Sequence, residues 1–260
     1  MTQIVPASDT KGPSPRRKSV HAWGLLGLAA FTAILPAASA ADGATAGGQD
    51  ISGVWWATTY SPSISLVGGG ALPYNAAGKA AYDRNIAGLK DGTLIDTARR
   101  FCTPDGVPRF LEAPYPFEIV QTPGQVTIIH ELNHSVRPIE MDRPLPKYED
   151  VVAYPYYSGH SVGHWDGNTL VIETTGFNEK TFLDATGAPH SDAMTTVERV
   201  RKIDGGKNLE DIVMVHDPDM FTRDWSARFV YASRNDVQLQ DHVCGEKHRD
   251  ISSVRGVQGH

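Results

Sequence analysis

The chain has 260 residues, with 24 Lys and Arg against 30 Asp and Glu, and a formal net charge of −6. Residues 1–40 alone carry +3, so the remaining 220 residues carry −9. A chain this acidic, with no basic run, argues against nucleic acid or an anionic membrane as a partner. Its length fits a single domain of the barrel or sandwich type.

The first 40 residues have the pattern of an export signal peptide. Arg16-Arg17-Lys18 precede an apolar run over 22–35, and Ala38-Ser39-Ala40 form a small-residue cleavage site. The run is short for a membrane span and has no stop-transfer flank, so we expect a soluble periplasmic product that begins near Ala41. The basic residues suit the general secretory route, and the arginine pair leaves the twin-arginine route open.

The chain contains two cysteines, Cys102 and Cys244. In an oxidising compartment an isolated pair is most simply a disulfide, and two independent buried thiols are the alternative. Closing a loop of about 140 residues contributes roughly 4 to 5 kcal/mol to stability on the chain-entropy account.

Ordered structure is expected to begin at Ile51, because the small, polar and glycine-rich segment 41–50 buries too little apolar surface to offset ordering. A strand over 51–60 comes next. One helix is predicted over 75–89, with Asn75 as its N-cap. Four residues are predicted to form its buried stripe: Ala76, Ala80, Tyr82 and Ile86.

The rest of the chain is rich in strand patterns separated by short turns. Strands are predicted over 117–122, 126–131, 135–141, 195–203, 209–216 and 225–231, with a hairpin over 159–177. This count predicts one all-β domain over 51–260: an antiparallel meander that closes into a calycin- or lipocalin-like barrel. Long loops near residues 105, 148 and 185 are expected to cap it, and the barrel interior is the expected ligand site.

Residues 159–177, GHSVGHWDGNTLVIETTGF, are predicted to turn at Asp166-Gly167, because both residues tolerate the positive φ of a type I′ turn. Pairing Trp165 with Asn168 places His160 opposite Glu173. Side chains opposite one another point the same way, so one face carries His160, Val162, His164, Val171 and Glu173. The other face carries Ser161, Gly163, Trp165, Leu170 and Ile172. A turn at Gly167-Asn168 keeps both faces unchanged.

His160 and Glu173 are candidates for acid–base catalysis, because a carboxylate beside an imidazole controls its tautomer and its basicity. The alternative is an ion pair on the outside of the sheet. Trp165, Leu170 and Ile172 favour their own face as the packed one, so the catalytic interpretation depends on which face turns inward.

We expect no metal. The histidine pairs 160/164 and 130/134 are four residues apart, which on a strand spans about 13 Å and is too far for two Zn–N bonds of about 2 Å. An assembly of His160, His190 and Glu173 from separate segments is the remaining metal alternative.

Two residues of the Pro-rich coil over 102–116 are candidates for substrate contact. Arg109 can clamp a substrate carboxylate, or else form a salt bridge with Glu112 or Glu118. Tyr115, like Tyr156 and Tyr157 further along, can stack on an aromatic substrate or donate a phenolic hydrogen bond, and simple packing is the alternative.

Two further titratable residues follow the hairpin. His190, with Ser191, can serve as an acid or equally cap its loop. Glu198 and Arg199 are adjacent on a strand and point opposite ways, so one of them is inward and needs a partner.

The segment GHSVGHWDGNTLVIETTGFNEKT, preceded by PRFLEAPYPFEIVQTPG and followed by Pro189-His190-Ser191, resembles a large family of secreted bacterial proteins over roughly 51–244. The chain resembles the sphingomonad members, some of which we associate with decarboxylation of lignin-derived phenylcoumarans to stilbenes. The resemblance implies a carbon–carbon lyase that needs no cofactor. His164 stands where many relatives have Arg, which marks it as a substrate-specific position.

For this chain, the resemblance implies that Arg109 holds the substrate carboxylate, and that His160 or a tyrosine such as Tyr115 takes the phenol proton. His190 or Glu198 then protonates the departing aryl oxygen, and Tyr157 contacts the aromatic substrate. A non-catalytic periplasmic carrier of an aromatic or apolar ligand is the competing class, because the same aromatic residues and Arg109 suffice for it.

Overall fold

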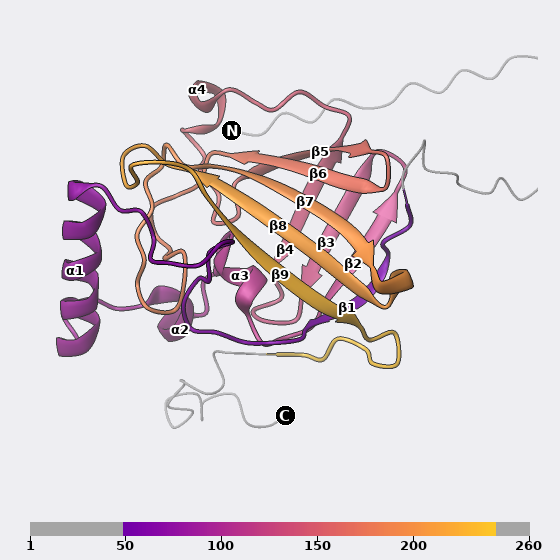
Figure 1. The fold of residues 1–260 in the computed structure, drawn as a ribbon, viewed down its shortest axis with the longest axis horizontal. Coiled ribbons are helices and arrows are strands. Elements are labelled where there is room, and N and C mark those ends of the chain that lie inside the picture. Colours follow the sequence, from indigo (N-terminus) through magenta and orange to yellow (C-terminus); the bar gives the residue numbers. More distant parts are fainter. Residues whose placement is uncertain (1–48, 243–260) are drawn as a thin grey trace, which may run out of the picture. The chain divides into compact units, whose positions relative to one another are not determined.

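The computed structural model describes residues 49–242, in which nine strands form one closed barrel (Figure 1). The strands follow one another around the barrel in chain order, and the last pairs with the first. They are β1 (Gly53–Ala57), β2 (Phe117–Thr122), β3 (Gln125–His130), β4 (Val136–Met141), β5 (His160–Asp166), β6 (Thr169–Thr175), β7 (Thr195–Ile203), β8 (Asn208–His216) and β9 (Trp225–Ser233). The all-β barrel predicted from the sequence is therefore confirmed.

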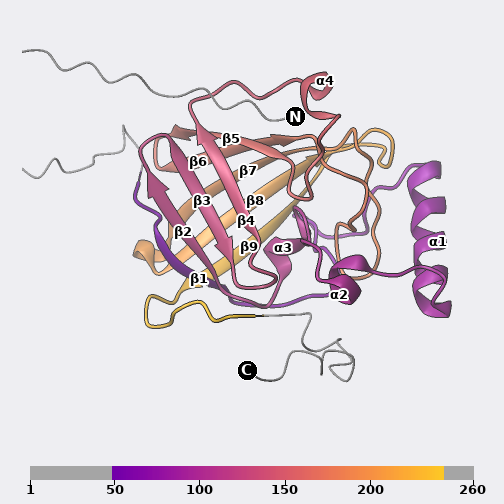
Figure 2. The ribbon, with the colours of Figure 1, turned by 180° about the vertical axis from the view of Figure 1, so that it is seen from behind.

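One strand pair departs from the predicted antiparallel meander, because β4 and β5 are parallel. A parallel pair needs a crossover connection, and the chain over 142–159 supplies it together with the short helix α4 (Tyr148–Val151) (Figure 2). The β4–β5 pairing covers only residues 139–141 and 161–163. The start of β4, before Ile139, is not paired with β5. We call this unpaired stretch between the two strands the seam.

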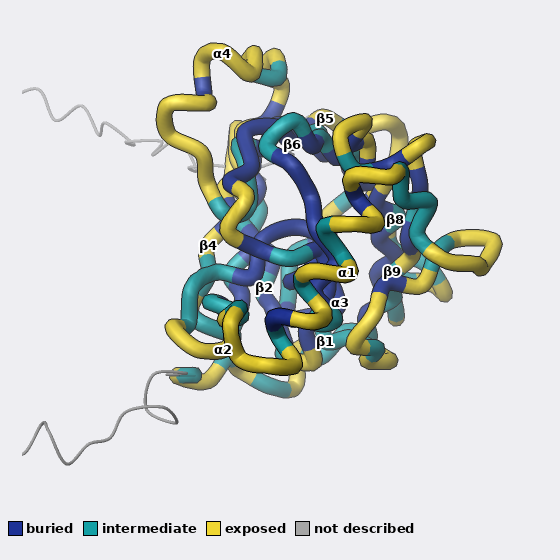
Figure 3. The backbone as a smooth tube through the Cα atoms, turned by 90° about the vertical axis from the view of Figure 1, so that its left-hand side faces the viewer, coloured by how far each residue is buried: buried dark blue, intermediate teal, exposed yellow. Residues whose placement is uncertain are grey.

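The barrel interior is packed with side chains. Along β4 the residues alternate, so that Arg137, Ile139 and Met141 are buried while the residues between them are exposed. Trp55 and Tyr231 are among the largest fully buried side chains of the core. Figure 3 shows the buried strands surrounded by exposed loops. The interior was the expected ligand site, but the larger cavities of the described residues lie at one end of the barrel and at the seam.

The described part of the chain forms four α-helices where one was expected: α1 (Ala76–Asp91), α2 (Thr97–Phe101), α3 (Arg109–Glu112) and α4. A 3-10 turn, η1 (Asp204–Gly206), joins β7 to β8. The N-cap prediction is confirmed, since the side chain of Asn75 accepts a hydrogen bond from the Gly78 amide at 2.8 Å. Within residues 49–242 none of the helices is long and apolar enough to cross a bilayer.

The predicted buried stripe of α1 is wrong at three of its four residues, and Tyr82 alone packs, half-buried, against the core. Ala76, Ala80 and Ile86 are exposed, and the buried positions are Gly78 and Gly88. A Cβ atom at Gly78 would overlap the Met220 carbonyl oxygen, so the helix docks through direct backbone contact at this position. Without large side chains at these positions, the apolar periodicity does not reveal the buried face.

Replacing Gly78 with Ala is expected to destabilise the protein by about 1–3 kcal/mol, because the Met220 backbone must move to admit the methyl group. Helix propensity alone predicts the opposite sign, a gain of about 1 kcal/mol. Chemical denaturation measures the change. Ala80→Gly, on the exposed side of the same helix, is the control and should lose only the propensity difference. A G78A protein more stable than wild type would contradict the backbone contact.

Candidate functional site

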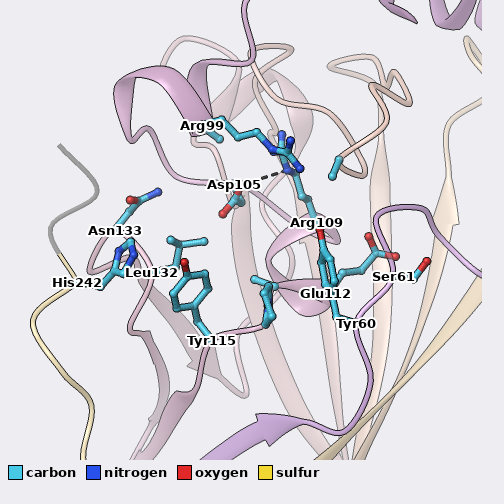
Figure 4. Close-up of a pocket in the computed structure, with 14 residues that line it drawn as sticks. Tyr60, Ser61, Arg99, Asp105, Arg109, Glu112, Tyr115, Leu132, Asn133 and His242 are labelled. Carbon is cyan, nitrogen blue, oxygen red and sulfur yellow. Dashed lines mark ion pairs between the residues drawn. The ribbon is translucent and has the colours of Figure 1, made fainter. Parts of the chain in front are cut away.

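The first of two large pockets lies at one end of the barrel beside α2 and α3 (Figure 4). Its volume is about 420 Å³, which is typical of small-molecule sites. It is lined by Tyr60, Ser61, Ala98, Arg99, Asp105, Arg109, Glu112, Ala113, Pro114, Tyr115, Leu132, Asn133, Ala185 and His242. We call this cavity the α3 pocket.

The helix α3 forms inside a segment that was predicted to be coil. Phe110 and Leu111 are buried in the core and fix the helix against the barrel. The Tyr231 hydroxyl donates a hydrogen bond to the Leu111 carbonyl at 2.9 Å. This attachment holds Arg109 and Glu112, at the two ends of the helix, in the wall of the pocket.

Arg109 is held by two aspartates. Its Nη atoms donate to both oxygens of Asp96, at 3.0 and 2.7 Å, and its Nε lies 3.1 Å from Asp105. The salt-bridge alternative is therefore correct in kind, but the partners are not the predicted Glu112 and Glu118. Because protein carboxylates occupy this guanidinium, it is poorly placed to clamp a substrate carboxylate.

Glu112 is the most perturbed acid of the α3 pocket. Burial raises the pKa of its carboxyl from 4.5 to about 8, and the negative charge of Asp184 adds to the shift while Arg109 opposes it. At neutral pH the carboxyl is thus mainly protonated and able to donate a proton. The sequence offered Glu112 only as a possible partner of Arg109, because nothing local indicates its burial.

His242 lies on the other side of the pocket from Glu112 in Figure 4. Its ring packs edge-on against Tyr115 with centroids 4.7 Å apart, and its backbone bridges to Leu132. Neither ring nitrogen has a hydrogen-bond partner within residues 49–242, although both are buried. An imidazole in this state can accept a proton from a bound ligand.

Arg99 also lines this pocket, and its guanidinium is less strongly paired than that of Arg109. Its side chain is 62% exposed, and its ion pair with Asp96 is long, at 3.6 Å. Asp96 is already engaged by Arg109 and by the first amides of α2, so it neutralises Arg99 only in part. Of the two arginines in the wall, Arg99 is the better placed to meet an anionic group.

The second pocket lies at the seam and has a volume of about 700 Å³. It is lined by Pro104, Ser135, Val136, Arg137, Pro138, Glu140, Pro144, Pro146, Val151, Tyr156, Tyr157, Ser158, Gly159, His160, Ser161 and Val162. We call it the seam groove. The predicted site residues are therefore divided: Arg109 and Tyr115 line the α3 pocket, whereas His160 and Tyr157 line the seam groove.

The hairpin has the predicted faces but not the predicted register. Glu173 pairs with Val162 and His160 pairs with Thr175, so the direct pairing of His160 with Glu173 is wrong. The turn residues are Gly167 and Asn168, a shift that keeps each face intact.

The apolar face of the hairpin turns into the barrel, so His160, His164 and Glu173 project outward. His164 is exposed. His160 contacts the crossover chain: its Nε2 lies 3.2 Å from the Tyr154 carbonyl oxygen, and its ring lies 4.4 Å from that of Tyr156. The catalytic interpretation of this face required it to turn into the barrel interior, and it does not.

Glu198 is the inward member of the Glu198–Arg199 pair and is fully buried. Arg137 donates to both of its oxygens, at 2.6 and 2.9 Å, and also donates to Ser161 and Thr174. This confirms that the inward residue has a partner. Arg137 was not predicted as this partner, although alternation places it on the same face of the strand VRPIEM as the apolar Ile139 and Met141.

Asp211 lies beside this ion pair inside the barrel. Burial raises the pKa of its carboxyl well above the usual range, and the negative charge of Glu198 adds to the shift. The shift favours the neutral carboxyl of Asp211, so the opposite charges of Arg137 and Glu198 balance within the cluster. This balance makes the cluster a structural element of the core.

His190 has the contacts of a loop cap. Its Nδ1–H donates to the Ser191 carbonyl at 3.0 Å, and the Thr181 hydroxyl donates to its Nε2 at 2.9 Å. Burial lowers the pKa of His190 and favours this neutral form. Ser191 in turn donates to Asp217 at 2.7 Å. The structure therefore favours the loop-cap interpretation of this segment.

Two other predictions involve residues at the ends of the chain. Cys102 lies at the C-cap of α2, but Cys244 lies outside the described residues, so their disulfide stays a prediction. The export signal over 1–40 also lies outside them. In the part of the chain that is described, no group of three or more His, Cys, Asp or Glu is placed to hold a metal ion.

The fold and the α3 pocket define a closed nine-stranded β-barrel with a polar-edged, largely apolar cavity at one end. No protein-family model matches the chain, and no curated protein matches it. Function is therefore inferred from the site itself and from the sequence resemblance.

Proposed function

We propose that the protein is a periplasmic carbon–carbon lyase that decarboxylates a phenolic biaryl acid such as a phenylcoumaran to a stilbene, with the α3 pocket as its active site. The observation that carries the proposal is Glu112, a buried carboxyl with a pKa of about 8 in the wall of an aromatic-lined cavity. A perturbed acid in such a cavity is typical of proton-transfer sites. The resemblance described above supplies the reaction class.

In the first step the proposed base, His242, takes the proton of the substrate phenol. The phenolate electrons form a quinone methide as the benzylic carbon–oxygen bond of the dihydrofuran ring breaks. Glu112 protonates the departing aryl oxygen, so no free aryloxide accumulates. The separation of His242 and Glu112 across the pocket suits an elongated substrate whose two reacting oxygens lie on different rings.

In the second step the carbon–carbon bond to the carboxylate breaks. Its electron pair forms the stilbene double bond and restores the phenolate ring, and carbon dioxide leaves. His242 returns its proton to the phenolate, and Glu112 regains one from solvent, so each turnover consumes one proton. The quinone methide is the electron sink, and the proposed mechanism uses no cofactor.

Arg99 is the proposed partner of the substrate carboxylate. Its exposed guanidinium lines the pocket, and its pairing with Asp96 is weak. Arg109 has a different role in this proposal: with Asp96 and Asp105 it links α2 to α3 and so positions Glu112. Tyr60 and Tyr115 offer ring faces to the aromatic substrate.

Incubation of the purified protein with a phenylcoumaran carboxylic acid, with and without chelator, tests the proposal. We expect stilbene absorbance and carbon dioxide to appear in equal amounts. Retention of the acid without product would reject the lyase and favour the carrier alternative, for which the apolar lining of the pocket also suffices.

Replacing His160 with Ala is expected to leave turnover of the biaryl acid within about twofold of wild type, because His160 lines the seam groove and not the α3 pocket. Steady-state kinetics measures the effect, and Glu112→Gln in the same assay is the positive control. A large loss of kcat in H160A would move the active site to the seam groove.

A further inference from the structure

At the seam the barrel wall is open, and the residues at the bottom of the seam groove are polar. Since β4 and β5 pair only from Ile139 and Ser161 onward, the start of β4 is separated from the chain that leads into β5. Arg137 and Ser161 project inward from these strands, yet both line the seam groove. The groove therefore reaches from the outer surface to buried hydrogen-bonding groups.

A small chamber adjoins the groove and shares Ser135, Arg137 and Ser158 with it. The chamber also has Asp105 and His130 in its wall. Its volume is about 10 Å³. Only one water molecule or one hydroxyl group of a ligand fits such a space.

His130 has an unused hydrogen-bond acceptor in the wall of this chamber. The ring is 3% exposed and packs between Phe110 and Phe117, with centroids at 5.4 and 5.9 Å. Burial lowers the pKa of His130 to about 4, so the ring is neutral at pH 7, and the Phe110 carbonyl takes the ring N–H. Its Nε2 is left as an acceptor, and it has no hydrogen-bond partner among residues 49–242. A buried acceptor of this kind requires a donor.

The charges around the chamber favour a neutral donor over an anion. Arg137 is already neutralised by its two hydrogen bonds to Glu198. Asp105 brings a carboxylate, which is paired with Arg109 at 3.1 Å. A ligand carboxylate would meet this negative charge and could not donate to His130, whereas a hydroxyl group can.

The walls of the groove are apolar and partly uncovered. Val136 and Tyr156 are 59% and 57% exposed. Four prolines line the same groove: Pro104, Pro138, Pro144 and Pro146. Proline rings and a tyrosine offer flat contact surfaces to an aromatic ring at little cost in conformational entropy.

We propose that the seam groove is a second binding site, which takes a neutral phenol. The aromatic ring lies against the prolines and Tyr156, and the hydroxyl enters the chamber and donates to Nε2 of His130. Its chamber shares one wall residue, Asp105, with the α3 pocket, but the phenol contacts named here lie outside that pocket and do not depend on the proposed decarboxylation.

Titration of the full protein with 4-methylphenol, followed by calorimetry and by backbone amide shifts, tests this site. We expect saturable binding, with shifts over residues 135–138 and 156–162. The matched probes 4-methylanisole, which cannot donate, and 4-methylbenzoate, which is anionic, should bind at least about tenfold more weakly, the loss expected for one unmade hydrogen bond. Equal binding of either probe, or no saturable binding, would overturn the proposal.

Two variants separate this site from the α3 pocket. His130→Phe keeps the ring packing and removes the acceptor, so 4-methylphenol should bind at least about tenfold more weakly while the fold is retained. Ser158→Phe fills the groove from a half-buried position and should abolish binding even if H130F proves unstable. Glu112→Gln should leave the affinity unchanged. Binding that survives S158F, or that is lost in E112Q, would assign the phenol to another site.

Discussion

Replacing Glu112 with Gln is expected to lower kcat for the biaryl acid by about 10²–10⁴-fold, because the amide keeps the size of the carboxyl group but cannot protonate the departing oxygen. KM should change little, since the carboxylate of the substrate is held by Arg99. Steady-state kinetics measures both values. Glu118→Gln, on the neighbouring strand β2, is the matched control and should retain wild-type turnover. Full activity in E112Q would eliminate Glu112 as the acid.

The same group predicts the pH dependence of turnover. The reaction requires the protonated carboxyl, and the pKa of Glu112 is about 8, so kcat of the wild type should fall as the pH rises through 8. The residual activity of E112Q should lack this alkaline limb. A limb that persists unchanged in the variant would belong to another residue.

Glu112 also links stability to pH. Its pKa is about 8 in the folded state against an ordinary value of 4.5, so the folded protein binds more protons between these values. Its contribution is fully present below pH 4.5 and is lost as the pH rises to 8. The Tm of E112Q should therefore exceed that of wild type by more at alkaline than at acidic pH. A difference that is constant across this range would contradict the shift.

The second large effect is expected at Arg137. Replacing it with Met should destabilise the protein by about 3–5 kcal/mol, because Glu198 is left in the core without its cation. The variant also removes the donors to Ser161 and Thr174. Equilibrium denaturation in urea measures the loss. Replacing Arg137 and Glu198 together by apolar residues should restore part of it, since no charge is then left unpaired.

Arg199→Met is the matched control for this experiment. Arg199 lies beside Glu198 in the sequence but points outward, where its ion pair with Asp166 is about half exposed. An exposed pair contributes only about 0–1 kcal/mol. Equal losses of stability in R137M and R199M would show that the buried ion pair stabilises the protein no more than the exposed one.

The hairpin shows how far local patterning determines structure. The alternation of residues predicted which side chains of His160–Asp166 and Thr169–Thr175 share a face, and the structure has those faces. The register differs by two residues, because the turn uses Gly167-Asn168. A two-residue shift leaves every side chain on the same face, so the apolar pattern does not distinguish between the two registers.

The residues of the α3 pocket show what local patterning leaves out. Glu112 belongs to a short helix in a Pro-rich segment, Arg99 to α2, and His242 follows the last strand. Their sequence neighbours give no sign that they meet. The pKa of Glu112 depends on burial and on Asp184, which is far away along the chain.

The sequence by itself determined the class of fold and the capped start of α1. It also determined that one of Glu198 and Arg199 points inward and needs a partner. These results follow from alternation, turn residues and the cost of burying a charge. Only the tertiary structure decided which hairpin face turns inward, how β4 meets β5 and which carboxyl is protonated at neutral pH. Each of these depends on contacts between distant segments, since burial and electric fields come from the whole fold and not from the neighbouring residues.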